Sequence, residues 1–114
     1  MRYESSCHCG NVRFEVEGEI ESVVRCNCSI CKRRGHLLWF VPKSSLKFLK
    51  GEDDMGAYQF GEKIITHHFC KICGIAMLSD GEMNGVTKAG LNLNCFKDVD
   101  VNTYEMMDYD GAAI

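Results

Sequence analysis

The stretch Cys70-Lys71-Ile72-Cys73-Gly74 is a C-x-x-C-G element, and together with Cys7-His8-Cys9 it supplies four thiols. Four thiolates are what a closed structural zinc site needs. Such a site would join the start of the chain to its later half. Structural zinc contributes an apparent free energy of about 10 to 16 kcal/mol in small peptides, as much as the whole stability of a typical domain. We therefore expect loss of this site to unfold the protein. The alternative for Cys7 and Cys9 is ordinary buried strand cysteine.

A second group of thiols, Cys26, Cys28 and Cys31, falls within six residues. Three protein ligands leave the fourth position of a tetrahedral zinc for water or substrate, so this spacing predicts an open, working metal site. Two alternatives remain. In one, the site is closed by a fourth ligand from the chain; in the other, Cys28 and Cys31 form a reversible disulfide without metal. The candidate fourth ligands are Cys95, His8, His36, His67 and His68.

Three cations, Lys32, Arg33 and Arg34, directly follow this group. They could form a solvated loop. Three thiolates on a divalent zinc leave a net negative charge, however, and nearby cations would offset it. Arginine also binds carboxylates in bidentate fashion, so we interpret Arg33 and Arg34 as candidate contacts to a small acidic ligand. His36 is the nearest candidate for a general base.

The composition is that of a water-soluble globular chain. Its 114 residues suit one domain spanning residues 1–114, and the net charge of -3 gives no general attraction to nucleic acid. Residues 1–25 contain no secretory signal, and the longest strictly apolar run, Leu37 to Val41, is too short for a membrane span. We therefore expect a cytoplasmic protein that binds neither nucleic acid nor membrane.

The cysteine pattern favours metal over disulfides. Eight cysteines could form a disulfide framework in a secreted chain, but seven of them occur in C-x-C or C-x-x-C groups. Neighbours at that spacing are poorly placed to bridge one another and well placed to share a metal. Cys95 stands alone and could be plain core packing. A redox role for Cys95 with a resolving thiol is a further alternative.

The remaining sequence predicts many short strands. Val12, Phe14 and Val16 alternate with charged residues, which indicates a half-buried strand. The apolar run that ends before Pro42 indicates a buried strand. Ser29 is expected to cap a short helical turn. The other expected elements are strands at 46–49, 57–60, 64–69, 76–79 and 86–93, a loop from Asp80 to Gly85, and a loose end after Tyr104. Such a pattern favours a small all-β fold.

Taken together, three segments resemble the glutathione-dependent formaldehyde-activating enzyme family, which also contains centromere protein V. The family pattern runs C-x-C-G-x-V-x-F, then C-H-C-S-x-C-R-R, then F-C-x-x-C-G. This chain has matching segments at 7–14, 26–33 and 69–74, in the same order. Two departures are Asn27, where the family usually has histidine, and Cys95, which interrupts a segment that is often G-x-L-D.

The resemblance implies a β-tent, a zinc-stapled fold of antiparallel sheets. It implies one structural zinc on Cys7, Cys9, Cys70 and Cys73, and a second zinc on Cys26, Cys28 and Cys31. The second site is the one to which the glutathione thiol is thought to bind, and it could be empty or oxidised in a given preparation. The implied activity is that of a carbon-sulfur lyase acting on S-hydroxymethylglutathione or a similar thiol adduct. The alternative is a non-catalytic zinc module that carries a thiol or binds another protein.

Overall fold

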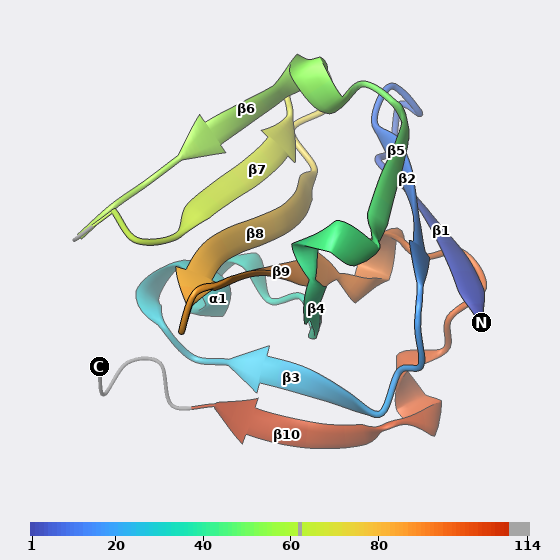
Figure 1. The fold of residues 1–114 in the computed structure, drawn as a ribbon, viewed down its shortest axis with the longest axis vertical. Helices are drawn as coiled ribbons and strands as arrows, with labels where there is room; N and C mark the ends of the chain where they lie inside the picture. Colours follow the sequence, from blue (N-terminus) through green and yellow to red (C-terminus); the bar gives the residue numbers. More distant parts are fainter. Residues whose placement is uncertain (62, 110–114) are drawn as a thin grey trace.

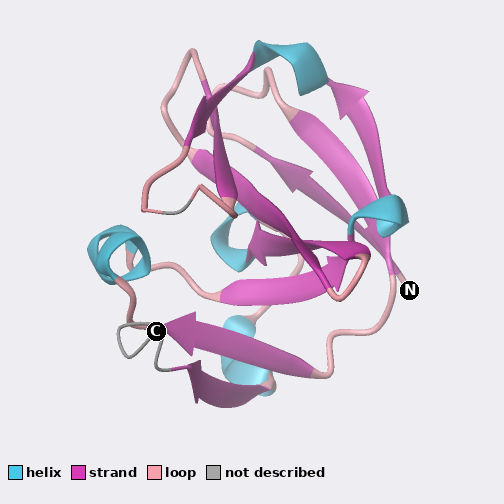
Figure 2. Cartoon of the chain, turned by 60° about the vertical axis from the view of Figure 1, so that its left-hand side comes forward, coloured by secondary structure: helices cyan, strands magenta, loops and turns pink. Residues whose placement is uncertain are grey.

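The computed structural model describes residues 1–61 and 63–109. Its strands form a three-stranded sheet of order β1-β2-β5 and a seven-stranded sheet of order β10-β3-β4-β9-β8-β7-β6 (Figures 1 and 2). The predicted all-β fold is confirmed; neighbouring strands pair antiparallel, except that β10 pairs in parallel with β3. The strands are β1 (Arg2–Ser6), β2 (Arg13–Glu17), β3 (Ser22–Cys26), β4 (Leu38–Pro42), β5 (Leu46–Lys50), β6 (Met55–Tyr58), β7 (Thr66–Cys70), β8 (Ala76–Met83), β9 (Val86–Asn92) and β10 (Glu105–Tyr109).

Short helical segments connect some of these strands. The α-helix α1 covers Ser29–Arg34. The 3-10 turns are η1 (Lys43–Ser45), η2 (Glu52–Asp54), η3 (Leu93–Cys95) and η4 (Val101–Thr103). In the part of the chain that the structure describes, no helix is long and apolar enough to cross a membrane.

The alternating segment predicted near the N-terminus is β2. Phe14 and Val16 are fully buried, whereas Arg13 and Glu17 face outward. β2 is the middle strand of the smaller sheet, pairing antiparallel with both β1 and β5. The rings of Phe14 and Phe48 lie 5.3 Å apart across the β2–β5 pair, on the face that packs into the core. The period of two therefore identified both the strand and its buried face.

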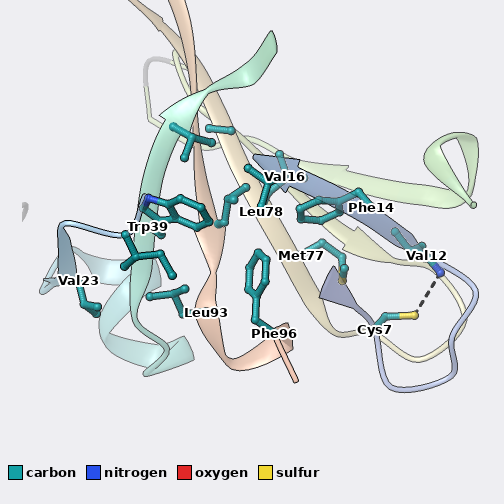
Figure 3. Packing of buried hydrophobic residues seen from close by; sticks show 14 of the residues in the cluster. Cys7, Val12, Phe14, Val16, Val23, Trp39, Met77, Leu78, Leu93 and Phe96 are labelled. Carbon is teal, nitrogen blue, oxygen red and sulfur yellow. Dashed lines mark hydrogen bonds between the residues drawn. The ribbon is translucent and has the colours of Figure 1, made fainter. Parts of the chain in front are cut away.

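An aromatic cluster joins this sheet to the larger one. Trp39 of β4 meets Tyr3 of β1 edge to face, with ring centroids 5.5 Å apart, and Phe96 lies 6.1 Å from both Trp39 and Phe14. Figure 3 shows Phe14, Trp39 and Phe96 within the core, with Cys7 at its margin. Edge-to-face pairs of this kind add about 0.5 to 1.5 kcal/mol each beyond their burial. The cluster fixes β1, and hence the first cysteines, against the larger sheet.

The apolar run before Pro42 forms β4, an interior strand of the larger sheet, which confirms the predicted buried strand. Leu38, Trp39 and Val41 are buried. Phe40 points the other way and is half-exposed, and a Cβ added at Gly90 would lie only 2.9 Å from its ring. Phe40 therefore covers the glycine of the neighbouring strand.

The prediction of a loop from Asp80 to Gly85 is wrong. β8 continues to Met83 and β9 begins at Val86, with register pairs running up to Met83 and Val86. Only Asn84 and Gly85 form the turn, and both have positive φ, 54° and 81°. An Asn-Gly pair in this conformation closes a two-residue hairpin, because its twist matches that of the flanking strands.

The prediction of a loose end after Tyr104 is also wrong for the residues that the structure describes. Glu105–Tyr109 forms β10, which pairs in parallel with β3 at the edge of the larger sheet. Arg25 Nε donates to Asp108 Oδ1 at 2.7 Å across this pair. All five residues of β10 are exposed, so the strand has no buried face to produce an apolar period. Pairing brings Tyr109 opposite Cys26, next to the group of three thiols.

Candidate metal centres

The four thiols predicted to hold the fold meet in one cluster. Cys7 and Cys9 come from the turn after β1, Cys70 ends β7, and Cys73 lies in the turn that follows. The Cys9 sulfur is 3.6 Å from that of Cys7 and 3.7 Å from that of Cys70, and all four sulfurs lie within 4.8 Å of one another. These separations suit ligands of one cation, and all eight cysteines of the chain are unbridged.

Both turns of this four-thiol cluster end in a glycine with a left-handed backbone. Gly10 follows Cys9 with φ of 81°, and Gly74 follows Cys73 with φ of 78°. The Gly10 amide donates to the Cys7 carbonyl and the Gly74 amide to the Cys70 carbonyl, at 3.2 and 2.9 Å. Glycine adopts this conformation at little steric cost, so the sequence itself bends each turn back toward its sulfurs.

Backbone amides surround the sulfurs of the four-thiol cluster. The Val12 amide donates to Cys7 Sγ at 3.3 Å (Figure 3), and the Cys73 amide donates to Cys70 Sγ at 3.5 Å. Hydrogen bonds from the Cys9 and Ile75 amides lower the pKa of Cys73 to about 6. Metal ligands must be thiolates, and donors directed at sulfur favour that form. The donor set and its surroundings therefore fit a thiophilic cation such as zinc.

The three-thiol cluster is built at the junction of β3 and α1. Cys26 ends β3, Cys28 is the residue before the helix, and Cys31 lies within it. Their sulfurs also lie within 4.8 Å of one another, and all three side chains are half-buried. The Cys28 amide donates to Cys26 Sγ at 3.5 Å. Burial opposes ionisation of Cys28, but the amides of Cys31 and Ile30 help to lower its pKa below the ordinary value.

The predicted helix cap is displaced by one residue. Ser29 is the first residue of α1, whereas Cys28 occupies the N-cap position with φ of -62° and ψ of 167°, and its side chain makes no capping hydrogen bond. The Cys28 thiol lies instead among the other two sulfurs.

No fourth side chain of the described residues joins the three-thiol cluster. Cys95 lies elsewhere, with its thiol 3.7 Å from the Ala76 carbonyl. His67 is hydrogen-bonded to Ser79 at 2.7 Å, and His68 to Asp80 at 3.0 Å. Three of the five candidate fourth ligands, Cys95, His67 and His68, therefore have other partners. As far as the structure describes the chain, this cluster is one ligand short of a closed site.

A pocket of about 400 Å³ adjoins the three-thiol cluster. Cys26 and Cys31 line it together with Lys32, His36 and Tyr109. The Asn27 amide donates to the Tyr109 carbonyl at 3.2 Å, which holds β10 against the cysteine loop. Sequence reasoning missed Tyr109 and Asp108 as pocket residues, because they lie far along the chain in a strand without an apolar period.

The predicted ligand contacts Arg33 and Arg34 differ in their surroundings. Arg33 is exposed and its Nη1 donates to the Ser29 carbonyl at 2.9 Å. Arg34 is half-buried and lines a second cavity together with His36. Burial, with Arg34 and His67 nearby, lowers the pKa of His36 to about 4. The imidazole is therefore neutral at pH 7.

Comparison with known proteins identifies a family and a similar solved structure. A model of the family described as glutathione-dependent formaldehyde-activating enzyme matches residues 2–109. A crystal structure of a Rhodobacter sphaeroides protein, a structural genomics target, superposes with a TM-score of 0.79 at 30% sequence identity. The superposition covers 91% of this chain and 99% of that one. The family match extends through both cysteine clusters and β10.

Proposed function

Because this chain belongs to the glutathione-dependent formaldehyde-activating enzyme family, we propose that it is a zinc-dependent carbon-sulfur lyase acting on S-hydroxymethylglutathione or a similar thiol adduct. The observation that carries this proposal is the three-thiol cluster, which adjoins a pocket and has no fourth ligand among the described residues. The four-thiol cluster is its structural counterpart. In this proposal each cluster holds one zinc ion, and the partner is a thiol in the cytoplasm.

A zinc ion held by Cys26, Cys28 and Cys31 would supply a Lewis-acid position for the sulfur of the adduct. Thiol activation alone contributes little. A free thiol is a few per cent ionised at neutral pH, so complete ionisation gains roughly thirtyfold, or about 2 kcal/mol. The remaining acceleration has to come from how the protein positions the adduct.

In the lyase direction, the carbon-sulfur bond of the adduct breaks, formaldehyde leaves, and the hydroxyl proton of the adduct ends on the glutathione sulfur. A neutral imidazole can accept a proton from the hydroxyl group and return it to sulfur. His36 lines the pocket beside Cys26 and Cys31 and is the proposed carrier of this proton. Lys32, which lines the same pocket, offsets the negative charge of three thiolates.

Magnetisation-transfer NMR on glutathione and formaldehyde, with the zinc-loaded chain, tests this proposal. We expect the protein to speed exchange between free glutathione and its hydroxymethyl adduct. Cys28→Ser should abolish the acceleration, while Lys47→Ser, an exposed change on β5, should retain it. An unaccelerated exchange with both zinc ions bound would contradict the lyase and favour the alternative, a thiol carrier or a protein-interaction module.

A further inference from the structure

A second cavity, of about 380 Å³, is lined by residues close in sequence to both cysteine clusters. Arg34 and His36, which follow the three-thiol cluster in the sequence, form one part of its lining. Residues 74–76, which follow the four-thiol cluster, form another part, and β9 with η3 completes it through Asn92, Asn94 and Cys95. His36 also lines the pocket beside the three thiols, so the two hollows meet at this side chain.

The Arg34 guanidinium in this cavity lacks an anionic partner. It makes no hydrogen bond or ion pair to another residue in the described ranges, although it is half-buried. Arg25 shows the contrast, because its bond to Asp108 raises its pKa. Burial lowers the pKa of Arg34, and the charge interaction with Cys31 opposes that shift without reversing it. Burying a cation without a counter-charge costs free energy. A bound anion would remove that cost.

The rest of the lining is suited to receive an anion. No aspartate or glutamate is among the described residues that line it. Asn94 is exposed at its rim, and the turn that carries it is fixed, because the Asn94 amide donates to Asn92 Oδ1 at 3.0 Å. Asn92 is itself buried and donates to the Ala76 carbonyl at 2.8 Å. The cavity therefore carries one arginine, one imidazole and amide groups, and hydrogen bonds hold the turn at Asn92 and Asn94 in place.

We propose that this cavity binds a carboxylate group, with the Arg34 guanidinium as its principal partner. Arginine presents a planar pair of donors that matches the two oxygens of a carboxylate. A phosphate dianion carries about twice the charge, whereas one arginine is the sole permanent cation of the described lining. If the proposed function holds, one ligand occupies both sites. Its carboxylate lies in this cavity, and its thiol reaches past His36 to the three-thiol cluster.

Arg33 is the matched control for Arg34. Both belong to α1 and carry the same group, but Arg33 is exposed and tied to the Ser29 carbonyl. The probe is S-methylglutathione, which keeps both carboxylates but cannot offer a thiolate, and the comparison ligand is its diester, which keeps the ammonium group and has no carboxylate. Binding of each to the zinc-loaded full chain is measured by titration in NMR spectra, which also report whether each variant is folded.

We expect S-methylglutathione to bind about tenfold or more tightly than its diester, because a charged hydrogen-bonded pair is lost in the ester. Arg34→Gln should weaken the binding of S-methylglutathione by about the same factor and leave the binding of the diester unchanged. Arg33→Gln should change the binding of neither probe. Asn94→Ala, a milder change at the rim, should weaken the acid more than the ester without altering the fold.

Three results would overturn the carboxylate site: equal binding of acid and diester, equal effects of Arg33→Gln and Arg34→Gln, or an Arg34→Gln effect that is the same for both probes. Failure of the lyase proposal gives a different pattern. In that case adduct exchange is not accelerated, yet the Arg34-dependent preference for the acid persists, because the probe needs no reaction at zinc.

Discussion

The sulfur atoms of Cys9 and Cys70 lie 3.7 Å apart, although 61 residues separate them in the chain. This contact joins the turn after β1, in the smaller sheet, to the end of β7, in the larger sheet. Both sulfurs belong to the four-thiol cluster. A cation at this position would therefore tie together two sheets that also meet at the aromatic core around Trp39 and Phe96.

Removal of one thiol from the four-thiol cluster is expected to unfold the protein. We predict that Cys70→Ser is already unfolded at room temperature and shows no cooperative transition on heating. The reason is that a structural zinc contributes about as much free energy as the whole domain stability. Circular dichroism against temperature is the measurement. Cys95→Ser, a half-buried cysteine outside both clusters, is the control and should lose no more than about 2 kcal/mol. A folded Cys70→Ser protein would show that the sheets hold without this metal.

Removal of a thiol from the three-thiol cluster is expected to have the opposite outcome. Cys28→Ser should keep the native circular dichroism spectrum while the zinc content falls from two ions per chain to one, measured by elemental analysis. The reason is position: Cys26, Cys28 and Cys31 are close in sequence, so their metal closes no long loop. Wild-type protein that holds a single zinc after full reconstitution would contradict the two-site assignment.

Gly56 and Phe69 form a size-matched pair across β6 and β7. A Cβ added at Gly56 would lie 2.4 Å from the Phe69 ring. Gly56→Ala should therefore destabilise the protein by about 1 to 3 kcal/mol in urea unfolding. Phe69→Leu in the same chain should recover part of that loss, because the smaller side chain leaves room. If the loss of stability in the double variant equals the sum of the losses in the two single variants, the two side chains do not interact.

The pH dependence of stability should include a term from His36. Its pKa is about 4 in the folded protein, below the ordinary value of 6.5. The unfolded chain therefore takes up the proton first as pH falls, so stability decreases from about pH 6.5 to about pH 4 and is fully retained above pH 6.5. Allowing for solvent screening of a partly exposed ring, the loss is at most about 2 kcal/mol.

Urea unfolding at pH 7 and pH 5, with zinc in excess, measures the His36 term. His36→Gln should lose less stability than wild type between these two values, because glutamine does not titrate. Acid release of metal affects both proteins and cancels in the comparison. His8→Gln, a change at an exposed histidine, should behave as wild type. Identical pH dependence of all three proteins would refute the role given to His36.

The sequence by itself determined the grouping of the cysteines and most of the strands. Metal-binding spacing is a local property, so C-x-C and C-x-x-C were readable without any tertiary information. The strand at Phe14 and Val16 was equally readable, because one buried face imposes a period of two on its residues. The structure places the seven cysteines in the same two clusters that the sequence predicted. That they bind zinc remains a prediction.

Only the tertiary structure decided which residues surround those clusters. β10 has no buried face. Its sequence pattern therefore did not predict that it would pair with β3 and bring Tyr109 opposite Cys26. Arg33 and Arg34 are equivalent as sequence neighbours, but the course of α1 exposes the first and half-buries the second. The cavity at Arg34 arises where three distant segments meet. Contacts between such segments depend on packing and strand pairing, which leave no local period in the chain.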